Sequence, residues 1–162
     1  MDQEEQLMKT MQAAMAKAPA NRATQILAQG SVCAEAVLLA VCQEFGIEDK
    51  VDPAIANLFA GGIGCTGSVC GAVAGAVMGI GLVKGRSGSW EDSMPNHALV
   101  QEFRRRYEDE METISCAELT GLDLTTPEGM QQMMSSEEVI GTCFTSVGVA
   151  YKLAVKVLKE NE

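Results

Sequence analysis

The sequence predicts an all-α protein, a single-domain bundle of about six to eight helices with one glycine-rich loop. Three observations support this prediction. Apolar residues recur at helical spacing, as at Leu7, Met8, Met11 and Met15 in the first segment. Helix-capping residues stand before most apolar segments. No stretch alternates apolar and polar residues as a strand does, and 162 residues are enough for one domain.

Capping and helix-breaking residues divide the first half of the chain into predicted helices. Asn21 caps a short second helix, and Gly46 is a natural residue to follow the end of the third. Asp52 and Pro53 start a fourth helix, because aspartate caps a helix and proline fits its first turn. The predicted helices cover residues 2–18, 21–30, 31–46 and 53–60.

The second half begins with the loop GGIGCTGS at residues 61–68. A helix over 69–84 follows, and the turn GRSGS at 85–89 leads to Trp90. Ser115 and Glu118 have the spacing of a capping box and open a short helix that ends at Gly121. The other helices are expected over 97–111, from Thr126-Pro127-Glu128 onward, and from Gly141-Thr142-Cys143 to Leu158.

The composition excludes several classes of partner. Lys and Arg number 12 against 22 Asp and Glu, which gives a formal net charge of −10 and a pI near 4.6. An acidic surface repels phosphate backbones, so nucleic acid is not expected as a partner. Aromatic residues make up only 4%, which leaves few platforms for stacking bases or flavin rings. The unusual counts are 16 Gly, 10 Met and 6 Cys, and they point to sulfur chemistry.

We expect a cytoplasmic protein with no membrane insertion. The amino terminus, MDQEEQ, is acidic and no apolar segment follows it, so a signal peptide is not predicted. The stretch from Pro53 to Val83 has no charge, but it holds eight glycines and few large aliphatic residues. We expect two buried helices around a loop there. In a reducing compartment, cysteines are more often free thiols, metal ligands or redox couples than structural disulfides.

Four of the six cysteines share one local setting. Cys33, Cys70, Cys116 and Cys143 each follow a predicted helix cap by one or two residues. Free N–H groups and the positive dipole end at a helix start favour a thiolate over a thiol. The separations of 37, 46 and 27 residues match no local metal motif, so the fold would have to assemble a shared site. The alternative is that these cysteines are only small buried apolar residues.

The other two cysteines differ from these four. Cys42 lies in the middle of a predicted helix among Leu38, Val41 and Phe45, and we expect it in the core. Cys65 lies in the glycine loop, five residues before Cys70. It is a candidate resolving thiol or an additional metal ligand.

Glycines surround Cys70 on both sides. Residues 62–67 read G-x-G-x-x-G, but they follow a predicted helix and not a strand, so a dinucleotide site is not expected. Gly64 and Gly67 would instead let the backbone pass close to a neighbouring helix or to a cofactor at the sulfur site. Gly71 and Gly75 begin a run of glycines at every fourth position of the next helix. That run predicts either a tight helix crossing or room for a cofactor.

The chain resembles a known family of bacterial and archaeal redox-active proteins, labelled by its motif C_GCAxxG_C_C. Residues 70–75, CGAVAG, match its CGAxxG core, and its other characteristic cysteines match Cys33, Cys116 and Cys143. The resemblance covers roughly residues 25–158 and implies a cysteine-centred redox role, without supplying a substrate or a settled cofactor. Cys42, Cys65 and the methionine-rich first helix lie outside the family's pattern.

Two sulfur mechanisms are open. In the first, which we favour, Cys33, Cys70, Cys116 and Cys143 ligate an iron–sulfur cluster for electron transfer or sensing. In the second, Cys70 attacks as a reactive thiol, and Cys33 or Cys65 resolves the disulfide. A structural zinc site and a helical interaction module with inert cysteines are the alternatives.

The domain assignment follows the cysteines. Residues 1–24 are predicted to form an amphipathic helix that serves as an appendage or a dimer contact, and residues 25–162 form the four-cysteine redox domain. We expect an electron donor or acceptor protein as partner, and a homo-oligomer through the methionine-rich helix. The main geometric prediction is that the four cysteines converge in one pocket near residues 61–67.

Overall fold

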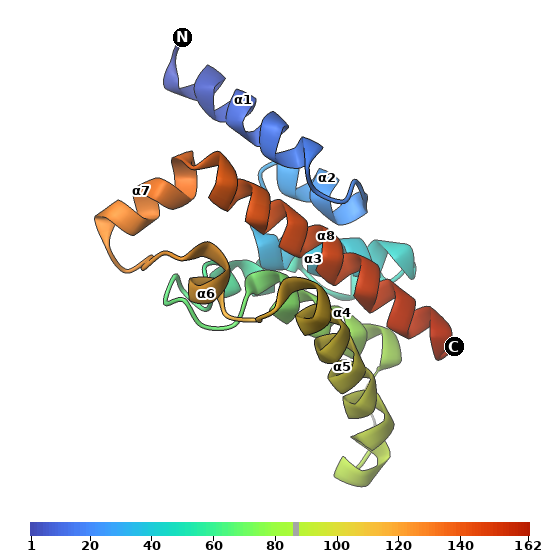
Figure 1. Ribbon diagram of the computed structural model, residues 1–162. Coiled ribbons are helices and arrows are strands. Elements are labelled where there is room, and N and C mark those ends of the chain that lie inside the picture. Colours follow the sequence, from blue (N-terminus) through green and yellow to red (C-terminus); the bar gives the residue numbers. More distant parts are fainter. Residues whose placement is uncertain (86–87) are drawn as a thin grey trace.

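The computed structural model describes residues 1–85 and 88–162, and within them the protein is all-α, which confirms the predicted fold class (Figure 1). The α-helices are α1 (Gln3–Ala16), α2 (Arg22–Ala28), α3 (Cys33–Glu44), α4 (Gly71–Lys84), α5 (Trp90–Met111), α6 (Cys116–Thr120), α7 (Pro127–Ser135) and α8 (Glu137–Glu160). Two 3-10 helices, η1 (Glu48–Lys50) and η2 (Pro53–Phe59), connect α3 to the glycine loop.

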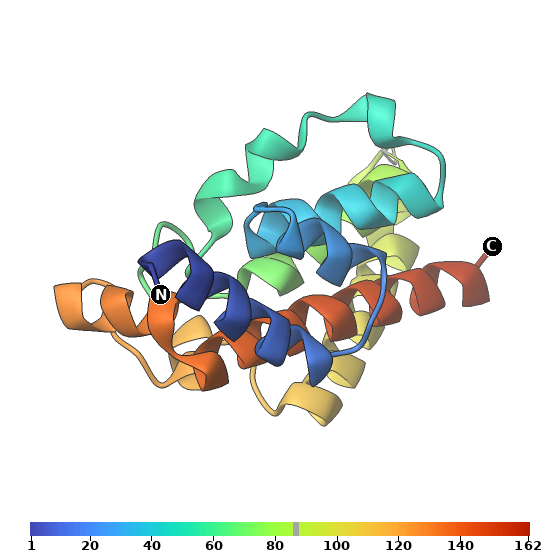
Figure 2. The same cartoon turned by 90° about the horizontal axis from the view of Figure 1, so that it is seen from above.

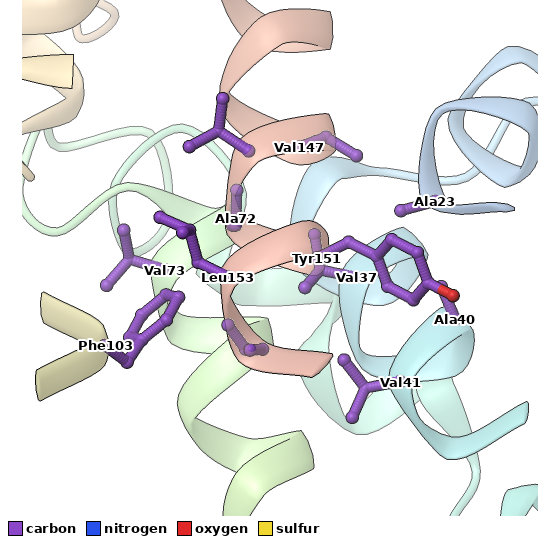
Figure 3. Packing of buried hydrophobic residues seen from close by; sticks show 14 of the residues in the cluster. Ala23, Val37, Ala40, Val41, Ala72, Val73, Phe103, Val147, Tyr151 and Leu153 are labelled. Carbon is purple, nitrogen blue, oxygen red and sulfur yellow. The ribbon is translucent and has the colours of Figure 1, made fainter. Parts of the chain in front are cut away.

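Helix α8 is the centre of the bundle. It packs against α1 and α2 on one side and against α3, α4 and α5 on the other, as Figures 1 and 2 show. Its apolar face carries Val147, Tyr151 and Leu153 into the core, where they meet residues of α3, α4 and α5 (Figure 3). In the described part of the chain, α8 is the one helix long and apolar enough to cross a membrane by length and composition. Its apolar face is covered here by neighbouring helices.

Helices α3 and α4 cross closely because α4 carries glycines at the crossing. A Cβ atom on Gly75 would collide with the backbone carbonyl oxygen of Ala34, and one on Gly79 would lie 2.8 Å from Val41 Cγ1. Real Cβ atoms essentially never come within 3.0 Å of another atom. Of the two expectations for this glycine run, the tight crossing accounts for Gly75 and Gly79.

Two helices begin earlier than the sequence predicts. Helix α5 starts at Trp90 and not at His97, because Ser89 and Asp92 form a reciprocal capping box, and the helix continues through Pro95. Helix α8 starts at Glu137 and not after Cys143. Ser136 caps it while also ending α7, so no linker separates the two helices. The predicted turn over 85–89 includes residues 86–87, which lie outside the described residues.

Helix α1 lies along α8 and also contacts α7 (Figure 2). Its Ala14 is fully buried, and Gly141 of α8 faces Ala14 across this contact. Asn21 caps α2 as predicted, and its side-chain amide also donates a hydrogen bond of 3.0 Å to the carbonyl oxygen of Gly148. The first helix therefore packs on the body of the domain.

Candidate functional site

One cavity of about 30 Å³ brings four cysteines together. Its volume is that of about one or two water molecules. The cysteines come from four different elements, and the remaining lining is uncharged. The sulfur-bearing residues of the lining are Cys33, Cys70, Cys116, Cys143 and Met133, and the other lining residues are Gly61, Gly71, Leu119, Thr120, Thr142 and Ser146.

Cys33 is the first residue of α3 and is held from two sides. The backbone N–H groups of Ala34 and Gly61 act on its thiol and favour the ionised form, which lowers its pKa. A Cβ atom on Gly71 would collide with this sulfur, so only glycine at position 71 leaves room for it. The first glycine of the CGAVAG segment therefore lies against a cysteine 38 residues earlier in the chain.

Cys70 and Cys116 are placed by a short antiparallel pairing of two extended segments. Val69 and Ser115 form an isolated β-bridge. The N–H of Cys70 donates to the carbonyl oxygen of Ile114 at 2.6 Å, and the N–H of Cys116 donates to that of Ser68 at 2.7 Å. Cys70 is then the cap residue of α4, and Cys116 is the first residue of α6. The pairing thus fixes two helix starts, and their cysteines, side by side.

Cys143 does not follow a helix cap, which corrects the prediction for this residue. It lies in the second turn of α8, because that helix begins at Glu137. Its place in the cavity comes from the face of α8 that looks toward α6 and α4, and Ser146 lies on the same face one turn later. Three of the four cysteines, and not four, therefore stand at helix starts.

The glycine loop has a left-handed backbone beside the cavity. All five residues from 61 to 65 have positive φ, including the non-glycine residues Ile63 (63°) and Cys65 (61°). Such a conformation costs about 1–2 kcal/mol for each non-glycine residue. Gly62 is required sterically as well, since a Cβ atom there would lie 2.7 Å from the Cβ of Cys116. The loop closes one side of the sulfur cavity at the expense of local strain.

Cys65 does not line the cavity. It is half-buried in the loop, and its sulfur lies behind Gly61, where an added Cβ atom would be 2.7 Å from it. Cys42 is fully buried in a second core cluster with Ala34, Leu38 and Ala56, as expected. All six cysteines are free thiols in the structure.

The four glycines expected near a cofactor have different environments. Gly71 alone among them lines the cavity. Gly75 faces the Ala34 backbone, and a Cβ atom on Gly67 would lie 2.9 Å from the Cβ of Ala117 in α6. Gly64 has open space around it. The structure therefore brings Gly71 to the cysteines, while Gly67 and Gly75 pack elements together and Gly64 faces outward.

Burial raises the pKa of the cavity thiols, whereas a position at a helix start was expected to favour the thiolate and so lower the pKa. Desolvation, with the neighbouring Cys70 as second cause, raises the pKa of Cys33 to about 12, although the two backbone N–H groups act in the opposite direction. Desolvation and then Cys70 and Cys65 raise the pKa of Cys116 to about 11. The pKa of Cys143 is also raised, by desolvation first and by the three other cavity cysteines next. These three residues are therefore neutral thiols at pH 7 without a bound cation.

Two residues beside Cys70, Ser146 and Tyr107, were not predicted as part of the site. Ser146 Oγ lies 3.0 Å from Cys70 Sγ, and Tyr107 Oη lies 2.6 Å from Ser146 Oγ. The signal that could have found them is a serine on the otherwise apolar face of the last helix, next to Val147 and Ala150. Met133 and Leu119, which line the cavity from α7 and α6, carry no such signal.

The donor set fits a group held by several thiolates. Iron–sulfur clusters are bound by four cysteine sulfurs, and this cavity offers four. Among the described residues, no three His, Cys, Asp or Glu side chains are grouped to hold a single metal ion. Four thiols are also the donor set of a tetrahedral zinc site, so the chemistry of these side chains suits an iron–sulfur cluster or a zinc ion.

The family comparison agrees with the cavity. The family model described as "Putative redox-active protein (C_GCAxxG_C_C)" matches residues 31–157, a range that contains all four cavity cysteines. Searches of curated proteins and of solved structures found no significant match. The match covers most of the chain, and so the protein belongs to the C_GCAxxG_C_C family of redox-active proteins.

Proposed function

We propose that Cys33, Cys70, Cys116 and Cys143 ligate an iron–sulfur cluster that serves in electron transfer or sensing. The observation that carries this proposal is that four thiols from four separate elements line one buried, uncharged cavity. Membership of a redox-active family supports a redox role for the same residues. Bound there, such a cluster supplies one-electron redox chemistry that cysteine alone does not offer.

The surrounding residues suit a negatively charged group. The starts of α3 and α4 point N–H groups and the positive ends of their dipoles toward the cavity. The backbone N–H groups of Ala34 and Gly61 favour a negative charge on the Cys33 sulfur, because both lower its pKa. Leu119 and Met133 cover the cavity with apolar side chains, which limits water access and so lowers the local dielectric. Metal ligation replaces the thiol protons, so the raised pKa values make cluster binding pH-dependent.

We further propose an electron donor or acceptor protein as partner, in the cytoplasm. Ile55 and Leu58 on η2 are 66% and 77% exposed, and Ile63 is exposed in the loop that closes the sulfur cavity. The N–H of Gly64 donates to the carbonyl oxygen of Leu58 at 2.7 Å, so these apolar side chains are next to the loop whose Gly61 lines the cavity, and we propose that the partner docks there. The acidic net charge of −10 argues against nucleic acid as that partner.

Thiol–disulfide exchange is the second candidate, and the mutual proximity of the four cysteines favours it. Each of Cys33, Cys116 and Cys143 is near enough to Cys70 for their charges to interact. Against it, the raised pKa of Cys33 leaves little thiolate at pH 7 for a resolving attack. The cluster therefore has the stronger support.

A panel of cysteine variants separates these functions. We expect C33S, C70S, C116S and C143S each to lose most of the iron and acid-labile sulfide after anaerobic purification. Cys42→Ala is the matched control, because Cys42 is buried outside the cavity, and it should keep the wild-type iron content. Cys65→Ser should keep it too, since Cys65 does not line the cavity.

Two results would overturn the proposal. Iron content that does not depend on the four cavity cysteines would exclude them as ligands. Iron-free wild-type protein with a reversible loss of two free thiols on oxidation would establish dithiol chemistry in place of the cluster.

A further inference from the structure

A buried chain of hydroxyl groups ends on Cys70. Ser146 Oγ is 3.0 Å from Cys70 Sγ, and Tyr107 Oη is 2.6 Å from Ser146 Oγ. Tyr107 Oη also lies 3.8 Å from the same sulfur, a longer contact that competes with Ser146 for the hydrogen of Tyr107. Tyr107 comes from α5 and Ser146 from α8, while Cys70 caps α4. Three helices therefore meet through one hydrogen-bonded group of side chains.

Within residues 1–85 and 88–162, these two hydroxyl groups bond to each other and to the sulfur. Tyr107 is fully buried and Ser146 is 2% exposed. In the part of the chain that the structure describes, Ser146 and Thr24 are the buried polar residues, and Thr24 completes the capping box of α2. Among the described residues, the hydrogen-bond partners of the Ser146 side chain are instead Tyr107 and Cys70. Burying a hydroxyl among apolar side chains gains little stability, so the sulfur is the group that this arrangement serves.

The direction of these hydrogen bonds depends on whether the Cys70 sulfur carries a hydrogen or ligates a metal. A ligating cysteine sulfur has no hydrogen and can only accept hydrogen bonds. Ser146 then donates to Cys70 Sγ, and Tyr107 donates to Ser146 Oγ, so both hydroxyl hydrogens are used. No other arrangement of these two hydrogens satisfies both the sulfur and Ser146 Oγ at 3.0 and 2.6 Å.

We propose that Ser146 and Tyr107 are positioning residues that raise the reduction potential of the sulfur site by donating this hydrogen-bond chain to Cys70. The proposal rests on the proposed iron–sulfur function. Reduction adds negative charge that is shared by the ligating sulfurs, and a hydroxyl donor stabilises the more negative form. Removing the donor therefore favours the oxidised form and lowers the potential.

The test compares the redox titrations of wild-type, Ser146→Ala and Tyr107→Phe proteins, all purified with their cluster. Ser146→Ala should lower the equilibrium constant for reduction about tenfold, because a hydrogen bond to the charged sulfur is lost, and Tyr107→Phe should lower it less, because the hydrogen bond it loses is to Ser146. Tenfold corresponds to about 59 mV for a one-electron couple. The double variant should shift little further than Ser146→Ala, because Tyr107 acts mainly through Ser146.

Thr24→Val is the matched control. It removes the other buried hydroxyl, which does not line the cavity, and should leave the potential unchanged even if the protein becomes less stable. Circular dichroism and iron content establish that each variant is folded and loaded. If Tyr107→Phe does not fold, Ser146→Ala alone decides the question.

The outcomes separate this inference from the proposed function. A normal iron and sulfide content with a potential equal to wild type in Ser146→Ala overturns the role of Ser146 and Tyr107 and leaves the cluster standing. An equal shift in the Thr24→Val control would show that a general loss of stability changes the reduction potential, and this result would also overturn the role of Ser146 and Tyr107. A wild-type protein without iron and sulfide refutes the proposed function, and this inference with it.

Discussion

Replacing Gly75 by alanine should separate α3 from α4 and disturb the cysteines at their starts. A Cβ atom at this position collides with the carbonyl oxygen of Ala34, which is backbone and cannot turn aside as a side chain can. Such overpacking costs about 3 kcal/mol. Alanine recovers about 1 kcal/mol through its higher helix propensity, which leaves a net loss of about 2 kcal/mol. For a chain of this size, that loss lowers the melting temperature by roughly 4–8 °C.

Gly81→Ala is the matched control in the same helix. Nothing lies within 4 Å of a Cβ atom at Gly81, and its φ is not in the left-handed region. This variant should gain up to about 1 kcal/mol, because only the helix propensity changes. The assay is urea and thermal unfolding of the metal-free variants, followed by their iron content after reconstitution. We expect Gly75→Ala to lose iron binding, since Cys33 and Cys70 stand at the starts of the separated helices.

The result that would refute this reasoning is a Gly75→Ala protein as stable as Gly81→Ala. It would mean that the close approach of the two helices at Gly75 is not needed for the fold.

Two further predictions concern stability. The folded pKa values of Cys33 and Cys116, about 12 and about 11, exceed the ordinary value of 9.0, so the unfolded thiols ionise first. The metal-free protein should therefore keep its stability below pH 9 and lose it as the pH rises toward 12. Urea unfolding at several pH values measures this loss. A urea midpoint that does not change between pH 9 and 11 would contradict the prediction. Ser89→Ala should cost about 1 kcal/mol in thermal unfolding, because it removes the cap of α5. The exposed substitution Gln101→Ala in the same helix should cost nothing, and equal effects of the two would argue against the capping box.

Local signals in the sequence were sufficient for most helix starts. Asn21, Asp52, Ser115 and Thr126 each cap a helix as predicted, because capping depends on residues within one turn. Cys143 was misplaced because Ser136 both ends α7 and begins α8, so no loop residues mark the boundary. The segment after Asp52 forms a 3-10 helix, a distinction that its apolar pattern does not carry.

The chemistry of the site was only partly predictable. The motif and the predicted helix starts pointed to Cys33, Cys70, Cys116 and Cys143 as neighbours in one site. The raised pKa values were not predicted, because they depend on how deeply the assembled fold buries each sulfur, and no local sequence encodes that depth. Ser146 and Tyr107 are 39 residues apart, and only the packing of α5 on α8 brings them to Cys70.

The glycine loop shows the same contrast between what nearby residues predict and what the assembled fold decides. The glycines of this loop were expected to let the backbone pass close to a helix or to the sulfur site, and those at 61, 62, 64 and 67 all have positive φ. Ile63 and Cys65 share this conformation, although of the loop residues 61–68 it is Gly61 that lines the cavity. Cys65, a candidate ligand by its position in the sequence, lies outside the cavity.

The most direct test of the central claim is a single measurement on the wild-type protein. Anaerobic purification is followed by an absorption spectrum and by iron, sulfide and zinc analysis of the same sample. Ligation by the four cavity cysteines predicts a brown protein with stoichiometric iron and sulfide, whose colour bleaches on reduction with dithionite. A colourless protein that takes up neither iron nor sulfide after attempted reconstitution would contradict the cluster, and zinc in that sample would assign the four thiols to a structural metal site.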